Sequence, residues 1–261
     1  MLQKKNWLRA SSEDGLRIDS QGVVYRQDAD ELVVQEVDDY SPLKKRSGWS
    51  VDRYLIEAGT VRIEAKAFLN CDSMKCVVIP DSVKVIGESA FCSCNLLEEV
   101  VIPESVEEIC DFSFSGCISL RKVTIPHSVR IIGENVFDGC EELADVCFQP
   151  NSCLEYFPDG LFQNCNKLQS ITIPDSVSYI SKYAFAYTNS LRVVYLPDQI
   201  DFKSPEAYKS HNTFRLVVAM GWDFELLQHS MDSLEYIYIP AAKRNMLEEH
   251  LPHLKHLFVD K

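Results

Sequence analysis

The chain has 261 residues, of which 46% are hydrophobic, so it is long enough for one extended domain or two compact ones. Its 39 acidic and 26 basic residues leave a formal net charge of -13, and a surface of this sign would repel a phosphate backbone, which argues against a nucleic-acid partner. No stretch approaches the roughly 18 uninterrupted apolar residues of a membrane span.

Residues 1–55 are predicted to form an N-terminal cap. The stretch from Met1 to Gly15 lacks the apolar core of a signal peptide, so we expect a cytoplasmic protein as the sequence stands, or a secreted or cell-surface protein if a signal has been removed. The segment Gly22–Tyr25, followed by Asp28–Asp30 and Leu32–Val34, resembles the β-hairpin that often precedes repeats of the kind described below. The polar stretch from Asp38 to Ser50 is predicted to be a loop.

Residues 56–197 repeat one motif, mostly every 23 residues. From Ile79 it is Ile-Pro-x-Ser-Val-x-x-Ile-Gly-x-x-Ala-Phe-x-x-Cys-x-x-Leu-x-x-Val-x. The fifth copy departs from this frame, because it has Phe148-Gln149-Pro150 in place of Ile-Pro and two inserted residues. The six copies, called coils 1 to 6 below, begin at Ile56, Ile79, Ile102, Ile125, Phe148 and Ile173.

Each coil is predicted to contribute one short strand from its Leu-x-x-Val-x-Ile segment, which the proline ends. The Ser-Val-x-x-Ile-Gly segment then turns the chain across the other side, and Ala-Phe returns it to the interior. One coil cannot enclose a core, but stacked coils share one. Phenylalanine recurs at 68, 91, 114, 137, 162 and 185, and cysteine at 71, 94, 117, 140 and 165, with Thr188 at the sixth cysteine position. Both series are predicted to form ladders inside the stack.

The motif closely resembles the BspA-type subclass of leucine-rich repeats, which occurs in many bacterial and some protist surface proteins. The resemblance covers Ile56 to Pro197 in six copies. It implies a leucine-rich-repeat solenoid of right-handed stacked coils with a parallel β-sheet on one face. It also implies a role in adhesion or in recognition of a host or partner.

Residues 198–261 are predicted to form irregular C-terminal repeats and a cap. Strand-like segments continue at Phe214–Val218, Leu234–Ile239 and Leu254–Val259 and are expected to extend the same sheet. Between them, Trp222–Leu227 and Ala241–His250 have helical periodicity.

The residues that could carry chemistry are better explained by structure, so we predict no enzyme activity, no cofactor and no metal. The evenly spaced cysteines match a core position, and no Cys-x-x-Cys occurs. His250, His253 and His256 are three apart, but Pro252 would interrupt a shared helix. The recurrent serines after Pro-x, Ser82, Ser105, Ser128 and Ser176, are explained by hydrogen bonding within turns.

The residues on either side of the strand valine are predicted to point outward and to line an open sheet face. This series becomes aromatic towards the C-terminal end, where tyrosine and phenylalanine are typical of binding hot spots. The alternative is that C-terminal loops fold over this patch and bury it. The candidate partner-binding residues are Tyr195, Val217, Tyr236, Tyr238, His256 and Phe258.

The sequence therefore favours a non-catalytic protein-binding module whose partner it does not identify. The second hypothesis is a structural or self-assembling protein that dimerises through its sheet face or a solenoid end. A third is an enzyme hidden in the C-terminal 60 residues.

Overall fold

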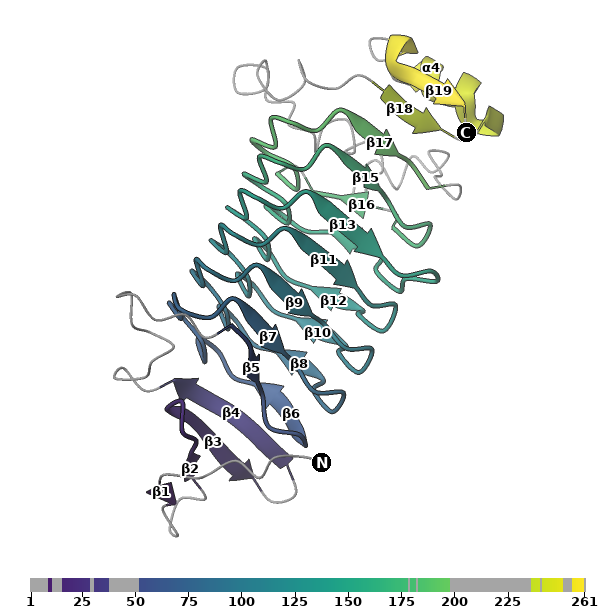
Figure 1. The fold of residues 1–261 in the computed structure, drawn as a ribbon. Coiled ribbons are helices and arrows are strands. Elements are labelled where there is room, and N and C mark those ends of the chain that lie inside the picture. Colours follow the sequence, from purple (N-terminus) through teal and green to yellow (C-terminus); the bar gives the residue numbers. More distant parts are fainter. Residues whose placement is uncertain are drawn as a thin grey trace.

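The computed structural model describes residues 9–10, 16–28, 31–37, 52–177, 179–181, 183–197, 236–239, 241–250 and 255–260. In these residues the chain forms a β-solenoid, which extends from an N-terminal hairpin to a short C-terminal helix (Figure 1). Parallel strands provide most of the regular structure, and helix in the described part is limited to short segments within residues 241–257.

The predicted strands pair in parallel along one face of the solenoid. They are β5 (Tyr54–Leu55), β7 (Cys76–Val78), β9 (Glu99–Val101), β11 (Lys122–Ile125) and β13 (Asp145–Phe148). Residues 23 apart lie side by side, so that Cys76 lies beside Glu99 and Lys122 beside Asp145. This register keeps equivalent side chains of successive coils on the same face, because side chains alternate along a strand.

A second parallel sheet covers a face that the sequence analysis assigned to a turn. It contains β6 (Thr60–Ile63), β8 (Val85–Ile86), β10 (Glu108–Ile109) and β12 (Ile131–Ile132). Its buried isoleucines come from the Val-x-x-Ile part of each coil: Ile63, Ile86, Ile109 and Ile132. The prediction of a sheet on one face only was incomplete, because a two-residue strand gives little sequence signal but pairs once the stack fixes its register.

The N-terminal hairpin continues this second sheet. Strands β3 (Val23–Asp28) and β4 (Glu31–Val37) pair antiparallel, and β2 (Leu16–Ile18) and β1 (Arg9–Ala10) follow outward. Strand β4 pairs in parallel with β6, so the hairpin covers the edge that coil 1 would otherwise expose. The predicted loop from Asp38 to Ser50 lies outside the described residues.

A buried hydrogen-bond network ties the hairpin to coil 1. The Tyr54 hydroxyl donates to the Asp19 carboxylate at 2.6 Å and lies 2.6 Å from the Tyr25 hydroxyl. The other Asp19 carboxylate oxygen accepts the main-chain N–H groups of Gln21 and Val23. Burial raises the pKa of both tyrosines, so both phenols stay protonated and continue to donate.

The interior contains the predicted phenylalanine ladder. Rings of successive coils stack face to face, from 4.9 Å between the Phe68 and Phe91 centroids to 5.7 Å between Phe162 and Phe185. The six rings are all buried. At the same corner, the phenylalanine N–H of one coil donates to a carbonyl of the next, for example Phe68 to Ala90 and Phe137 to Leu161. Backbone hydrogen bonds therefore join the coils along a third line besides the two sheets.

Serine hydroxyls add further bonds between coils. Ser82 donates to the carbonyl oxygen of Thr60 at 2.8 Å, and Ser105 donates to that of Val83 at 2.7 Å. The acceptors lie 22 residues earlier in the chain, so the prediction of bonds within the turn was wrong for these two serines. The reason is that the stacking of the coils places a main-chain carbonyl of the preceding coil within hydrogen-bond distance of each hydroxyl.

Both sheets are interrupted at coil 5. The first sheet ends at β13, and a new one begins at β15 (Ser170–Thr172). The second ends at β12, and among the described strands β14 (Tyr156–Phe157) pairs only with β16 (Tyr179–Ile180). The interior nevertheless continues, because Phe137 and Phe162 still stack at 5.7 Å with an interplanar angle of 4°. The interruption at coil 5 therefore affects the strand pairing and leaves the phenylalanine corner intact.

The C-terminal sheet differs from its prediction in strand order. Strand β17 (Val193–Tyr195) pairs directly with β18 (Tyr236–Ile239), which pairs with β19 (Phe258–Asp260). The spacing of the repeats had assigned the position next to β17 to residues 214–218, but β18 occupies it. Strand β18 fits there because its Ile237 and Ile239 continue the buried column of Val194 and Leu196. Residues 214–218 and 222–227 lie outside the described residues. A 3-10 turn (Ala241–Lys243) and α4 (Arg244–His250) follow β18.

Candidate partner-binding surface

The face that carries β7, β9, β11, β13, β15, β17 and β18 is called the first face. Its outward side chains form two columns along the stack. The first column contains Cys76, Glu99, Lys122, Asp145, Ser170, Val193 and Tyr236. The second contains Val78, Val101, Thr124, Cys147, Thr172, Tyr195 and Tyr238. None of these side chains is fully buried, whereas the residue between the two columns points into the core.

The two columns differ in charge. In the first, Lys122 forms an ion pair with Asp145 at 2.8 Å across neighbouring strands. In the second column, which begins at Val78 and ends at Tyr238, no residue has a carboxylate or a cationic side chain. This uncharged stripe crosses a chain whose net charge is -13. Its desolvation by a partner would therefore cost less than that of the rest of the surface.

The stripe ends at three tyrosines, which we call the tyrosine patch: Tyr195, Tyr236 and Tyr238. The rings of Tyr195 and Tyr238 stack at 4.5 Å with an interplanar angle of 16°, and Tyr236 lies 6.5 Å from Tyr238. Tyr236 remains 47% exposed, and the other two are half-buried. The strand pairing holds all three rings on one face, so a partner would meet a preformed aromatic surface.

The structure does not bring the other predicted residues into this patch. Phe258 is only 6% exposed and belongs to the core, which corrects its assignment to the outer face. The reason is that Lys255–Leu257 form a 3-10 turn, so the strand begins only at Phe258, which pairs with the inward-pointing Ile237. His256 is exposed on that turn and not on a strand. Val217 lies outside the described residues.

Arg244 fixes the end of the sheet behind the patch. Its guanidinium donates to the Asp260 carboxylate at 2.8 Å, to Glu248 at 3.0 Å and to the carbonyl oxygen of Phe258 at 3.1 Å. These bonds connect α4 to β19, which lies next to the tyrosine strand β18. The C-terminal segment thus supports the patch from the side of the last strand.

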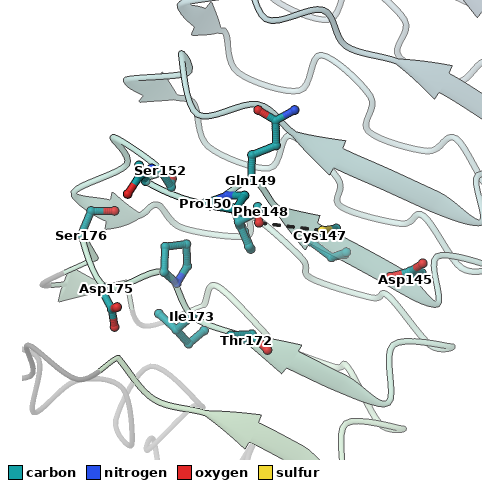
Figure 2. A pocket seen from close by; sticks show the side chains of 13 residues that line it. Asp145, Cys147, Phe148, Gln149, Pro150, Ser152, Thr172, Ile173, Asp175 and Ser176 are labelled. Carbon is teal, nitrogen blue, oxygen red and sulfur yellow. Dashed lines mark hydrogen bonds between the residues drawn. The ribbon is translucent and has the colours of Figure 1, made fainter.

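A groove that the sequence analysis did not anticipate lies between β13 and β15, where the first face is interrupted (Figure 2). Its volume is about 540 Å³, and residues 145–152 and 172–176 line it. Figure 2 shows Cys147 and Phe148 on one side of it and Thr172 and Ile173 on the other. The available sequence signal was the insertion in coil 5 together with Phe148-Gln149-Pro150 in place of Ile-Pro.

The ladder cysteines are structural. Cys71, Cys94, Cys117, Cys140 and Cys165 are buried and are present as thiols. Burial raises the pKa of the last four thiols, which keeps them protonated and unreactive. Outside the ladder, burial and the neighbouring Glu108 raise the pKa of Cys110 to about 11. Cys147 and Cys153 are exposed.

Two further classes of site were sought in the described residues. No group of three or more histidine, cysteine, aspartate or glutamate side chains there could hold a metal ion. No helix in that part of the chain is long and apolar enough to cross a membrane.

Short tandem coils, stacked parallel strands and an interior ladder of equivalent residues define a repeat-protein module of the leucine-rich-repeat class. The chain belongs to the BspA-type leucine-rich-repeat family, whose model matches six copies across residues 61–192. This confirms the resemblance seen in the sequence. The family is defined by a repeat scaffold and not by a reaction.

Solved structures share this fold. The leucine-rich repeat protein of T. pallidum is 23% identical with a TM-score of 0.58, and the match covers 73% of this chain and 93% of that one. The pneumococcal vaccine antigen PcpA is 19% identical with a TM-score of 0.56, and the match covers 71% of this chain but only 51% of the antigen. At these identities the likeness concerns the fold alone. A comparison with curated proteins found no match.

Proposed function

We propose that this chain is a non-catalytic module that binds a partner protein through the open first face, with the tyrosine patch at the centre of the contact. The observation that carries the proposal is the stacked pair Tyr195 and Tyr238 beside the exposed Tyr236, at the end of the uncharged stripe. Tyrosine supplies a large contact area and a hydroxyl at a low entropic cost, which is why it is enriched at binding hot spots.

The scaffold supports this role. Because the coils share one continuous core, the outward side chains vary without altering the fold, and the sheet presents them on a rigid surface. The absence of a predicted reaction motif points the same way. Recognition or adhesion at a cell surface is the setting that the family resemblance implies.

A double variant tests the proposal directly. Tyr236→Ser with Tyr238→Ser removes two rings of the patch, and Tyr183→Ser with Tyr187→Ser is the matched control, because Tyr183 and Tyr187 are 43% and 45% exposed and lie off the first face. We expect a protein recovered from the native cell by the unchanged chain and by the control to be lost with the patch variant. Purified, that protein should bind the patch variant at least ten-fold more weakly. Equal binding by all three would refute the proposal.

Self-assembly through the same surface is the second candidate, favoured by the fact that stacked tyrosines are self-complementary. It requires a concentration-dependent dimer in sedimentation experiments that the patch variant abolishes and the control retains. A monomer at all concentrations would exclude it and leave the foreign partner.

A further inference from the structure

The groove beside Phe148 has an apolar floor made of side chains that the repeat buries elsewhere. Val123 and Ile125 of β11 are fully buried. Their partners in β13, Val146 and Phe148, pack against the core but are only partly buried. The Phe148 ring stacks on the buried Phe157 ring at 5.3 Å between centroids, which holds it in place. The aromatic part of the floor is therefore preformed.

The groove is also lined by a buried hydroxyl that has no hydrogen-bond partner among the described residues, the Oγ of Ser176. In coils 2 and 3 the equivalent hydroxyls of Ser82 and Ser105 donate to a carbonyl oxygen of the preceding coil. Figure 2 shows the Ser176 hydroxyl directed towards the facing segment of coil 5. A buried hydroxyl without a partner is unfavourable, so this position favours a ligand that supplies one.

The lining contains polar side chains but no lysine, arginine or histidine. Its carboxylates belong to Asp145 and Asp175, and further hydroxyls come from Ser152 and Thr172. Carboxylates accept hydrogen bonds, and hydroxyls both donate and accept them. The groove therefore suits a ligand with several hydroxyl groups and disfavours an anionic one.

These features together select one ligand chemistry. A purely apolar molecule would leave the Ser176 hydroxyl unpaired, and a cation would have to compete with Lys122 for Asp145, which Lys122 already pairs at 2.8 Å. A neutral sugar ring has a face of C–H groups that fits an aromatic floor and a rim of hydroxyls that donate and accept. The groove volume of about 540 Å³ lies within the range of pockets that bind ligands.

We propose that this groove binds a neutral saccharide, with the C–H face of one sugar ring on Phe148 and a sugar hydroxyl as the hydrogen-bond partner of Ser176 Oγ. Other sugar hydroxyls donate to the acceptors of the lining. The site is separate from the tyrosine patch and does not rest on the protein-binding role proposed above.

Two native cysteines provide the test. Cys147 is exposed and lines the groove, whereas Cys153 is exposed but lies outside the lining. The probes are the methyl glycosides of glucose, galactose, mannose, xylose, N-acetylglucosamine and N-acetylgalactosamine, with glycerol and methyl glucuronide as controls. Mass spectrometry follows alkylation of both thiols by iodoacetamide. We expect at least one neutral glycoside to slow alkylation of Cys147 at least three-fold while that of Cys153 is unchanged.

Ser176→Ala tests the assigned hydrogen bond. Ser128→Ala is the matched control, because the Oγ of Ser128 is likewise buried without a partner among the described residues, but Ser128 does not line the groove. We expect Ser176→Ala to raise the glycoside concentration for half-protection about five-fold, the effect of losing one hydrogen bond. The control should leave that concentration unchanged.

Two further variants locate the bound sugar. Thr172→Trp fills the mouth of the groove from an exposed position and should abolish protection. Val101→Trp lies in the same column, is 49% exposed and does not line this groove, so it should retain protection. Tyr236→Ser with Tyr238→Ser should also retain it, so failure here and failure of the tyrosine patch are distinguishable.

Several outcomes would overturn the proposal. They are absence of protection by every neutral glycoside, equal protection by glycerol or methyl glucuronide, and equal effects of Ser176→Ala and Ser128→Ala. Protection by indole or by choline that matches that of the best glycoside would show a pocket for apolar or cationic molecules instead of a saccharide site.

Discussion

The thiol of Cys117 donates a hydrogen bond to the main-chain carbonyl oxygen of Phe91, one coil earlier, across 3.2 Å. Thr188 occupies the same position in coil 6, and its hydroxyl donates to Phe162 at 2.7 Å. This position therefore requires a small side chain with a donor and not the chemistry of sulfur. The same bond joins three further pairs: Cys94 to Phe68, Cys140 to Phe114 and Cys165 to Phe137.

The variants Cys117→Thr and Cys117→Val distinguish the effect of the hydrogen-bond donor from the effect of side-chain volume, because threonine and valine have nearly the same volume. We expect threonine to retain the bond to Phe91 and valine to lose it. The valine variant should therefore be less stable than the threonine variant by about 1 kcal/mol, the usual net contribution of one hydrogen bond. Urea unfolding of both variants measures the difference. Equal midpoints would show that packing alone determines the residue at this position.

The buried thiols make stability depend on pH in the alkaline range. Burial raises the pKa of Cys94, Cys117, Cys140 and Cys165 above the 9.0 of an exposed thiol. The unfolded chain therefore releases these protons near pH 9 while the folded chain retains them. Their contribution is fully present below pH 9 and is lost as the pH rises towards the folded values, with a limiting slope of about 1.4 kcal/mol per pH unit for each thiol.

We expect the free energy of unfolding to fall between pH 9 and pH 10 in the presence of a reductant. Cys117→Thr has one titrating thiol fewer, so its slope should be shallower by up to about 1.4 kcal/mol per pH unit. Urea midpoints at pH 7, 8, 9 and 10 supply both curves. A free energy that is constant from pH 7 to pH 10 would contradict buried, protonated thiols.

The repeat itself was readable from sequence because its signals recur. Phe91 or Cys94 alone would not predict a structure. Because equivalent residues recur one period away, both can be assigned to ladders inside the stack. The pairing of β7, β9, β11 and β13 follows from the same period. The two-residue strands of the second sheet were missed, since a pair such as Val85 and Ile86 forms a strand only when equivalent pairs stack beside it.

The candidate site was only partly predictable for a related reason. Tyr236 and Tyr238 continue the frame of β17 by alternation, and their outward direction followed from it. The direction of the Phe258 side chain could not be predicted in this way. The turn at Lys255–Leu257 shifts the start of β19, so that Phe258 points inward. The groove beside Phe148 lies at coil 5, which contains the insertion. The sequence shows where the insertion is but does not predict how the chain accommodates it.

Tyr54→Phe tests how the N-terminal hairpin is held to coil 1. The substitution deletes the hydroxyl that donates to the buried Asp19 carboxylate and contacts the Tyr25 hydroxyl. We expect a loss of about 1–3 kcal/mol, because a buried charged acceptor loses a donor. Hydrogen exchange should accelerate in β3 and β4 and remain unchanged in β9. Tyr156→Phe, at an exposed ring, is the control, and equal effects of the two variants would show that the network contributes nothing specific.

Gly87→Ala tests the close approach between coils 1 and 2. A Cβ at Gly87 would lie 2.7 Å from the Ile63 carbonyl oxygen and from main-chain atoms of Glu64 and Ala65. Main-chain atoms cannot rotate away as a side chain does, and the Gly87 N–H already donates to that Ile63 oxygen at 2.8 Å. We therefore expect the coils to separate locally, with a loss of about 1–3 kcal/mol in urea unfolding.

Cys110 supplies the matched control for Gly87→Ala, because it occupies the equivalent position in coil 3 and already carries a Cβ. Cys110→Ala should change stability by less than about 1 kcal/mol, since it removes only a half-buried sulfur. Hydrogen exchange at the Gly87 amide provides a second measurement, because separation of the coils would break its bond to Ile63 and expose it. If Gly87→Ala left both the unfolding midpoint and this exchange rate unchanged, glycine at this position would not be required for close packing of the coils.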